Sequence, residues 1–166
     1  MVNRNVAVIT PQEENIRRQI YTVRDVQIMI DHDLAVLFGV ETKAINQAAK
    51  RNLSRFPAEF RFQLTENEKN ELVTSCDRFK SLKHSSTLPY VFTEQGVAML
   101  SAVLRSRTAI EISISIINAF VAMRRFLVAH EPLLQRLDTL EKRQLGHEMK
   151  TDARFEQVFA ALDAKR

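Results

Sequence analysis

The chain has 166 residues, of which 45% are hydrophobic and 27% charged, with a formal net charge of +4 at pH 7. This composition is globular and too apolar for an intrinsically disordered chain, and its modest basicity points to a polyanionic partner only where the charge is clustered. Three glycines and four prolines are too few for a turn-rich β architecture or a glycine-rich phosphate loop.

The sequence gives no sign of secretion or membrane insertion. The apolar run near the N-terminus is too short for a signal peptide, and no apolar run approaches the roughly 18 residues of a membrane span. The single cysteine, Cys76, excludes an internal disulfide and fits a reducing compartment. We therefore expect a cytoplasmic protein without a membrane partner.

The first predicted elements are a leader and a hairpin. Residues 1–15 are polar and are expected to form a flexible leader. Over residues 20–30, β-branched side chains alternate with other residues on both sides of Arg24 and Asp25. Alternation of this kind predicts two short antiparallel strands.

Two helices joined by a tight turn are predicted over residues 33–52. A helix-turn-helix needs a small residue where the second helix crosses the first, a turn residue that tolerates positive φ, and apolar inward positions. Ala35 meets the first requirement and Gly39, four residues later, meets the second. The inward positions are all apolar: Leu34, Phe38, Val40, Ile45 and Ala48.

A strand, a short helix and a loop are predicted next. Pro57 cannot continue a helix, and Phe60, Phe62 and Leu64 alternate with polar residues, which predicts a strand with one solvent-exposed face. Thr65 and Glu68 have the spacing of a capping box that starts a short acidic helix. Residues 76–87 are polar and basic, and a loop is expected there.

The C-terminal half is predicted to be helical. After a strand over residues 88–93, Thr93 should cap a helix in which Gly96 allows close packing. Residues 108–130 lack glycine and proline and are apolar on most sides, which predicts a long core helix. Pro132 is expected to break this helix. Beyond it, the tail has a weak coiled-coil pattern with a slip near Thr151 (Leu133, Leu137, Leu140, Gln144, His147, then Phe155, Val158, Leu162).

Positive charge is concentrated around the second helix of the predicted pair. Five cations and two anions lie between Val40 and Arg61, a difference of +3 out of the net +4 of the chain. Residues 80–93 add Lys80 and Lys83 without an acid. The tail from residue 131 is balanced, with seven basic and seven acidic side chains. An ordinary solvated surface would explain the charge alone, but its coincidence with the helix-turn-helix spacing favours DNA.

The predicted outward residues of the second helix have side chains that suit DNA. Asn and Gln can pair with the adenine edge, Lys with guanine or phosphate, and Thr with phosphate near a helix N-terminus. Two arginines just beyond these positions suit phosphates better than bases, and the lysines at 80 and 83 extend the same expectation to the loop. The candidate DNA-binding residues are therefore Thr42, Lys43, Asn46, Gln47, Lys50, Arg51, Arg55, Lys80 and Lys83.

Three stretches of the sequence resemble one family. "DLAVLFGVETK", "RNLSRFPAEFRFQL" and "FTEQGVAML" stand without gaps within residues 20–125, and they are similar to the phage-type ORF-six N-terminal domain, a relative of the KilA-N and BRO-N domains. The resemblance implies a DNA-binding α+β domain of phages, large DNA viruses and bacterial chromosomes. It implies a DNA-contacting role for the helix "ETKAINQAAKRN", without saying which side chains touch bases.

Chemistry for catalysis or metal binding is not evident. Cys76 has no neighbouring base in a known motif, and the four histidines are scattered without ligand spacing. Ser-rich "KHSST" has no group that would activate a nucleophile. We therefore expect no enzyme activity, no cofactor and no metal.

The sequence thus predicts an α+β fold: a small sheet of short strands, a helix-turn-helix-like pair, a long core helix and a C-terminal coiled-coil tail. The expected boundaries are residues 16–129 for the DNA-binding domain and 130–166 for the tail. The expected function is transcriptional regulation or antirepression on double-stranded DNA, in the cytoplasm at the nucleoid, by a homodimer joined through the tail. The alternative is a protein-interaction module that binds a partner repressor and never touches DNA.

Overall fold

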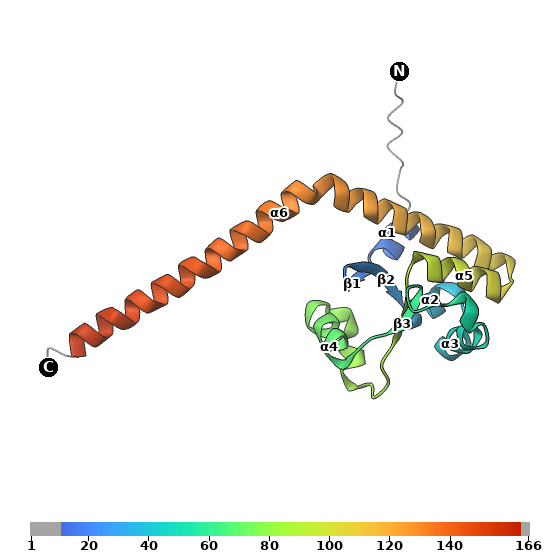
Figure 1. Cartoon of the computed structure of the whole chain (residues 1–166), viewed down its shortest axis with the longest axis horizontal. Coiled ribbons are helices and arrows are strands. Elements are labelled where there is room, and N and C mark those ends of the chain that lie inside the picture. Colours follow the sequence, from blue (N-terminus) through green and yellow to red (C-terminus); the bar gives the residue numbers. More distant parts are fainter. Residues whose placement is uncertain (1–10, 164–166) are drawn as a thin grey trace, which may run out of the picture. The chain divides into compact units, whose positions relative to one another are not determined.

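The computed structural model describes the backbone of residues 11–163 and the side chains of residues 11–80 and 82–157. The predicted α+β class is confirmed (Figure 1). The chain divides into two compact units, Met1–Met123 and Arg124–Arg166. Of the predicted leader, residues 1–10 lie outside the described range. The rest of it enters α1 (Pro11–Arg17), a helix that was not predicted and that buries Ile16 completely.

The four strands form one antiparallel sheet in the order β1-β2-β4-β3. β1 (Tyr21–Val23) and β2 (Val26–Ile30) are the predicted hairpin. Arg24 and Asp25 at its turn both have positive φ, 54° and 59°, as a tight hairpin that follows the twist of its strands requires. β4 (Tyr90–Phe92) lies between β2 and β3 (Arg61–Gln63).

Both faces of the sheet are covered, so neighbouring residues of one strand enter different hydrophobic clusters. Met29 and Phe92 belong to the first cluster, which involves α1, α2, α3, α5 and α6. Ile30 and Val91 belong to the second, which involves α4 and the segment after it. The alternation of side chains along a strand therefore divides the core into two parts.

The second cluster lies under α4 (Glu66–Ser75) and the 3₁₀ helix η2 (Asp77–His84). The predicted capping box is confirmed: the Glu68 amide donates to Thr65 Oγ1 at 3.3 Å, and the Thr65 amide donates to Glu68 Oε2 at 2.8 Å. The prediction of a loop is wrong over η2. Phe79 anchors this segment because its ring is buried and packs edge-on against Tyr21, with centroids 4.8 Å apart.

The two C-terminal helices are α5 (Glu94–Leu104) and α6 (Arg107–Asp163). Thr93 caps α5 as predicted, its hydroxyl oxygen accepting a hydrogen bond from the Gly96 amide at 3.4 Å. The predicted break at Pro132 is wrong, because α6 continues through this residue. A proline removes one backbone donor, and the good helix formers on both sides of it sustain the helix.

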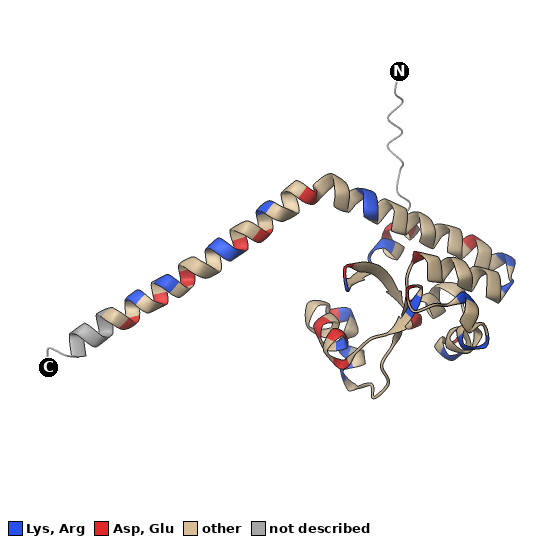
Figure 2. Cartoon of the chain, in the orientation of Figure 1, with Lys and Arg blue, Asp and Glu red and all other residues tan. Residues whose placement is uncertain are grey.

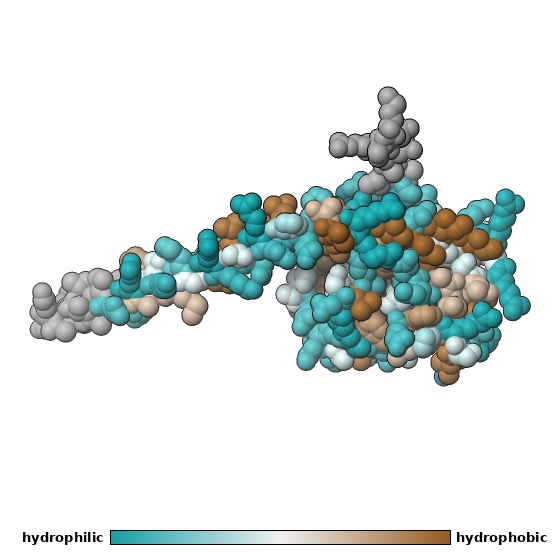
Figure 3. All heavy atoms as spheres, turned by 45° about the horizontal axis from the view of Figure 1, so that its top comes forward, coloured by the Kyte–Doolittle hydropathy of each residue, from teal (hydrophilic) through white to brown (hydrophobic). Residues whose placement is uncertain are grey.

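Only one face of α6 is buried in the first unit. Ala109, Ile116 and Phe120 are buried there, whereas Ile110 and Ile114 are 50% and 55% exposed. The predicted burial on most sides is therefore wrong, and Figure 3 shows exposed hydrophobic residues along the helix. An 18-residue window of α6 has a mean hydropathy of 1.6, which is apolar enough for a membrane span by composition and length, and 22% of it is buried. Core helices of soluble proteins pass the same test.

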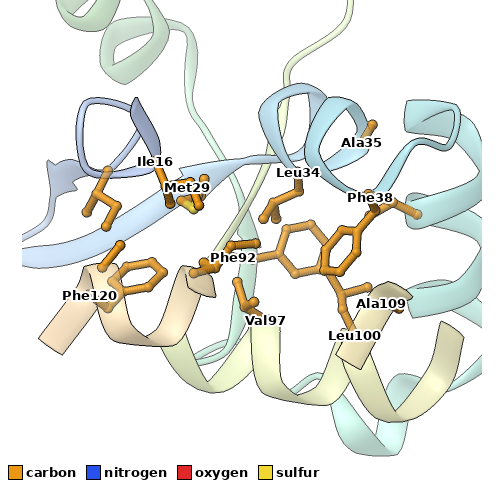
Figure 4. Packing of buried hydrophobic residues seen from close by; sticks show 14 of the residues in the cluster. Ile16, Met29, Leu34, Ala35, Phe38, Phe92, Val97, Leu100, Ala109 and Phe120 are labelled. Atoms are coloured by element: carbon orange, nitrogen blue, oxygen red, sulfur yellow. The ribbon is translucent and has the colours of Figure 1, made fainter. Parts of the chain in front are cut away.

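Phe92 lies at the centre of the first cluster. In Figure 4 the side chains of α2, Leu34 and Phe38, lie on one side of it, and those of α5, Val97 and Leu100, lie on the other. All five are buried. The helix-turn-helix pair is thereby packed onto α5 through the same aromatic core that holds the sheet.

Gly96 is predicted to be indispensable for this packing. A Cβ at this position would overlap the backbone carbonyl oxygen of Phe60, so the close approach is to the chain before β3 rather than to another helix. Because the obstacle is backbone, Gly96→Ala should lower the free energy of unfolding by about 1–3 kcal/mol in urea denaturation. Gly146→Ala, on an open part of α6, is the control and should be neutral or stabilising by up to about 1 kcal/mol. Equal stability of the two variants would contradict this role.

Candidate nucleic-acid interface

The predicted helix pair is present as α2 (Asp31–Phe38) and α3 (Thr42–Arg51). Gly39 between them has φ +67°, in the left-handed region that favours glycine. The turn is closed by the Val40 amide donating to the Ala35 carbonyl at 3.0 Å. Ile45 of α3 is completely buried beneath this turn. The sequence therefore places the turn correctly, and α2 and α3 pack against each other as expected.

Two of the predicted inward positions differ in the structure. Val40 is 39% exposed, because it lies in the turn before α3 begins rather than on either helix. Ala48 is half-buried, and the completely buried residue is Ala49, one turn after Ile45. Residues four apart lie on nearly the same line of a helix, so the buried line runs through Ile45 and Ala49.

The opposite side of α3 carries exposed polar and basic side chains. Lys43, Gln47 and Lys50 are exposed and recur at helical spacing along one line, which we call the α3 stripe. Arg51 at the end of α3 and Arg55 at the end of η1 (Leu53–Arg55) are also exposed. Thr42 at the start of α3 is half-exposed. Figure 2 shows basic residues on this helix.

Asn46 does not belong to this exposed line, and its predicted outward orientation is wrong. Its side chain is half-buried and hydrogen-bonded at both ends. The amide nitrogen donates to Asp31 Oδ2 at 2.7 Å, and the amide oxygen accepts from Arg61 Nη2 at 3.1 Å. Both ends of the amide are therefore held by contacts inside the protein and are not turned outward to read an adenine edge.

The Asp31 carboxylate is the centre of this polar network. Asp31 is 5% exposed. Its Oδ1 accepts from the His32 amide at 2.8 Å, and its Oδ2 accepts from Asn46 and from the Tyr90 amide at 3.2 Å. A buried carboxylate is tolerated only when its oxygens are satisfied in this way. The network joins the start of α2, the middle of α3 and strand β4.

Arg61 of β3 completes the network from the side of the sheet. Its guanidinium carbon lies 3.5 Å from the centroid of the Tyr90 ring, a cation–π contact. Burial lowers the pKa of Arg61, while Tyr90 and Asp31 act in the opposite direction. The prediction that this side of β3 faces solvent is wrong for Arg61, which is half-buried. Asp31, Arg61 and Tyr90 were missed because no local pattern marks them as neighbours.

Lys80 and Lys83 are not grouped with the α3 stripe. Both are exposed residues of η2, which packs against α4, whereas α3 packs against α2, α5 and η1. In Figure 1, α3 and α4 lie on opposite sides of β3. Lys80 also forms an exposed ion pair with Asp77 at 2.8 Å. The structure therefore leaves the exposed cations of α3 and η1 as the compact part of the candidate interface.

Residues that could hold a metal are not clustered in the part of the chain that the structure describes. No group of three or more His, Cys, Asp or Glu side chains has a suitable arrangement among residues 11–80 and 82–157, whose side chains the structure describes. The histidine nearest the interface, His32, is exposed beside Asp31. What this surface offers chemically is hydrogen-bond donors and positive charge.

Comparison with known proteins gives one match. The family model described as the ORF6N domain matches residues 18–103. This range begins just before the β1–β2 hairpin and ends within α5, so it contains the four strands, the helix pair and the polar network, whereas α1 and α6 lie outside it. Searches of curated proteins and of solved structures gave no match.

Asn46 and Gln47 should respond differently to truncation. Asn46→Ala would remove one hydrogen bond from the buried Asp31 carboxylate and one from Arg61, so the free energy of unfolding should fall by about 1–3 kcal/mol. Gln47→Ala, the neighbouring exposed amide, should change it by less than about 0.5 kcal/mol. Urea denaturation followed by circular dichroism measures both. An Asn46→Ala chain as stable as the Gln47→Ala chain would refute the structural role of Asn46.

Proposed function

Because the chain belongs to the ORF6N domain family, which is associated with phages, we propose that it is a DNA-binding regulator that inserts α3 into the major groove of double-stranded DNA. The observation that carries this proposal is the α3 stripe of Lys43, Gln47 and Lys50. These side chains are exposed on a helix whose other side is fixed in the core. A helix of this kind fits the major groove.

The proposed contacts are of two kinds: contacts to phosphates, which position the helix on the DNA, and a contact to a base edge, which reads the sequence. Lys43 and Lys50 displace counterions from phosphates, as do Arg51 and Arg55 at the end of the helix and in η1. Gln47 is the base-reading side chain, since its amide is exposed and can pair with adenine. Thr42 at the helix start suits a phosphate. Asn46 serves instead to hold α3 in place.

Two further features belong to the same proposal. The chain acts in the cytoplasm at the nucleoid, where its DNA target lies, and it neither acts as an enzyme nor needs a cofactor. Two copies associate through the part of α6 in the second unit, where Leu133, Leu137 and Leu140 are exposed. Pairing would double the DNA footprint and favour sites with two half-sites.

Affinity should depend on the lysines of the α3 stripe. Lys43→Ala/Lys50→Ala should weaken binding to all duplexes alike and reduce the slope of log affinity against log salt by roughly two. Fluorescence anisotropy with a random duplex at several salt concentrations measures this. Lys80→Ala/Lys83→Ala removes the same charge from η2 and should leave the slope nearly unchanged.

Two results would count against DNA contact through α3. Absence of binding at low salt would favour the alternative, a module that binds a repressor. Equal loss of affinity in the α3 and η2 variants would leave DNA binding intact but would remove α3 as its specific site.

Sequence preference should depend on Gln47. Gln47→Ala should flatten the preference at the contacted base by about 1–3 kcal/mol, while Lys50→Ala preserves the preference and lowers affinity. Selection of bound duplexes from a random pool, followed by sequencing, compares the two variants. If Gln47→Ala selects the same sites as the unaltered chain, Gln47 does not read the base.

A further inference from the structure

The second unit presents an apolar stripe that is exposed in the described part of the chain. Leu133, Leu137 and Leu140 are 54%, 50% and 57% exposed. Their spacing of four and three residues is that of the inward positions of a coiled coil, with Leu137 at position a and the other two at position d. Gln144 and His147, both exposed, continue the line at the next a and d positions.

The two borders of this stripe carry opposite charges. The residues that precede each a position, at g, are Arg136, Arg143 and Lys150. The residues that follow the d positions at 140 and 147, at e, are Glu141 and Glu148. One border is therefore basic and the other acidic. Figure 2 shows that basic and acidic residues both occur along this part of α6.

This separation of charge selects one orientation of pairing. In a parallel coiled coil, a g residue of one helix faces the e residue five positions later in the other helix. Arg136 then meets Glu141 of the second copy, and Arg143 meets Glu148 of the second copy. In an antiparallel pair, g faces g and e faces e, so arginines would meet arginines and glutamates would meet glutamates. We propose that a second copy of this chain covers the stripe, parallel and in register.

Most of the charged side chains at the borders are available for such contacts, whereas Glu148 accepts a hydrogen bond from Gln144 of its own helix at 3.4 Å. Among the described side chains, Arg136, Arg143 and Glu141 form no ion pair within their own helix. The ion pair that does form, between Lys142 and Asp138 at 2.7 Å, lies on the outer positions f and b. Lys142 and Asp138 thus neutralise each other at positions that a partner helix would not reach.

The residues at the stripe also fix the register. Gln144 is a polar residue at an a position, where a parallel pair would bring it beside Gln144 of the second copy. Within the stripe, any shift that sets Gln144 against leucine is penalised. Charged borders on both sides make the stripe unsuitable for a lipid surface. Because the basic border of one copy matches the acidic border of another, an identical chain is favoured over an unrelated helix.

Parallel pairing has a consequence for the first units. The N-terminal ends of both paired segments lie together, so both DNA-binding units are attached at the same end of the coil. A two-fold axis along the coil would then match a palindromic site. The inference rests on the self-association proposed above, while the pairing itself requires no DNA.

The test is sedimentation equilibrium of the full chain without DNA. Arg136→Glu/Arg143→Glu turns the attractive borders into repulsive ones, so self-association should weaken about tenfold or more. Adding Glu141→Arg/Glu148→Arg restores opposite charges in the parallel pair and should restore association. Lys142→Glu, compared with Arg143→Glu, makes the same charge change at the neighbouring outer position and should have little effect.

The outcomes separate orientation from assembly. The parallel arrangement is wrong if Arg136→Glu/Arg143→Glu associates as strongly as the unaltered chain. It is also wrong if the variant with all four substitutions associates as weakly as Arg136→Glu/Arg143→Glu. A monomeric unaltered chain would overturn the pairing altogether. Circular dichroism of each variant reports whether the helix is retained, and the DNA measurements described above are independent of all these results.

Discussion

The buried carboxylate of Asp31 is the constraint on which the position of the candidate interface depends. A charge in the core must be matched by donors, and here they come from the start of α2, from Asn46 of α3 and from the backbone of β4. Arg61, stacked on Tyr90, holds the other end of the Asn46 amide. The exposed residues of α3 therefore have a fixed orientation relative to the sheet, which direct recognition of base edges requires.

Because the sheet is packed on both faces, even this small unit can fix the position of α3. β2 and β4 are each three to five residues long, yet successive residues in them are buried in different clusters. One face supports the helix pair through Phe92, and the other is covered by α4 and η2. Gly96 allows α5 to approach the Phe60 backbone closely. The interface thus rests on one core, while η2 is supported by the other.

Local patterns predicted the parts of the fold whose causes are local. The hairpin, the turn at Gly39 and the capping box at Thr65 depend on residues within a few positions of each other. The role of Asn46 depends on partners 15 residues away in each direction and on Tyr90 in another strand, so its amide resembled a base reader. Likewise, η2 is held in place because Phe79 is buried and packs against Tyr21. The polar composition of this segment alone predicts a loop.

In the proposed function, the α3 stripe is the surface that contacts DNA. Amide NMR of the isotope-labelled full chain, titrated with a random duplex at low salt, tests it most directly. The largest changes in chemical shift are expected at Lys43, Gln47, Lys50 and the nearby Arg55, with little change in α4 and η2. Changes centred on α4 and η2, or none at saturating duplex, would contradict it.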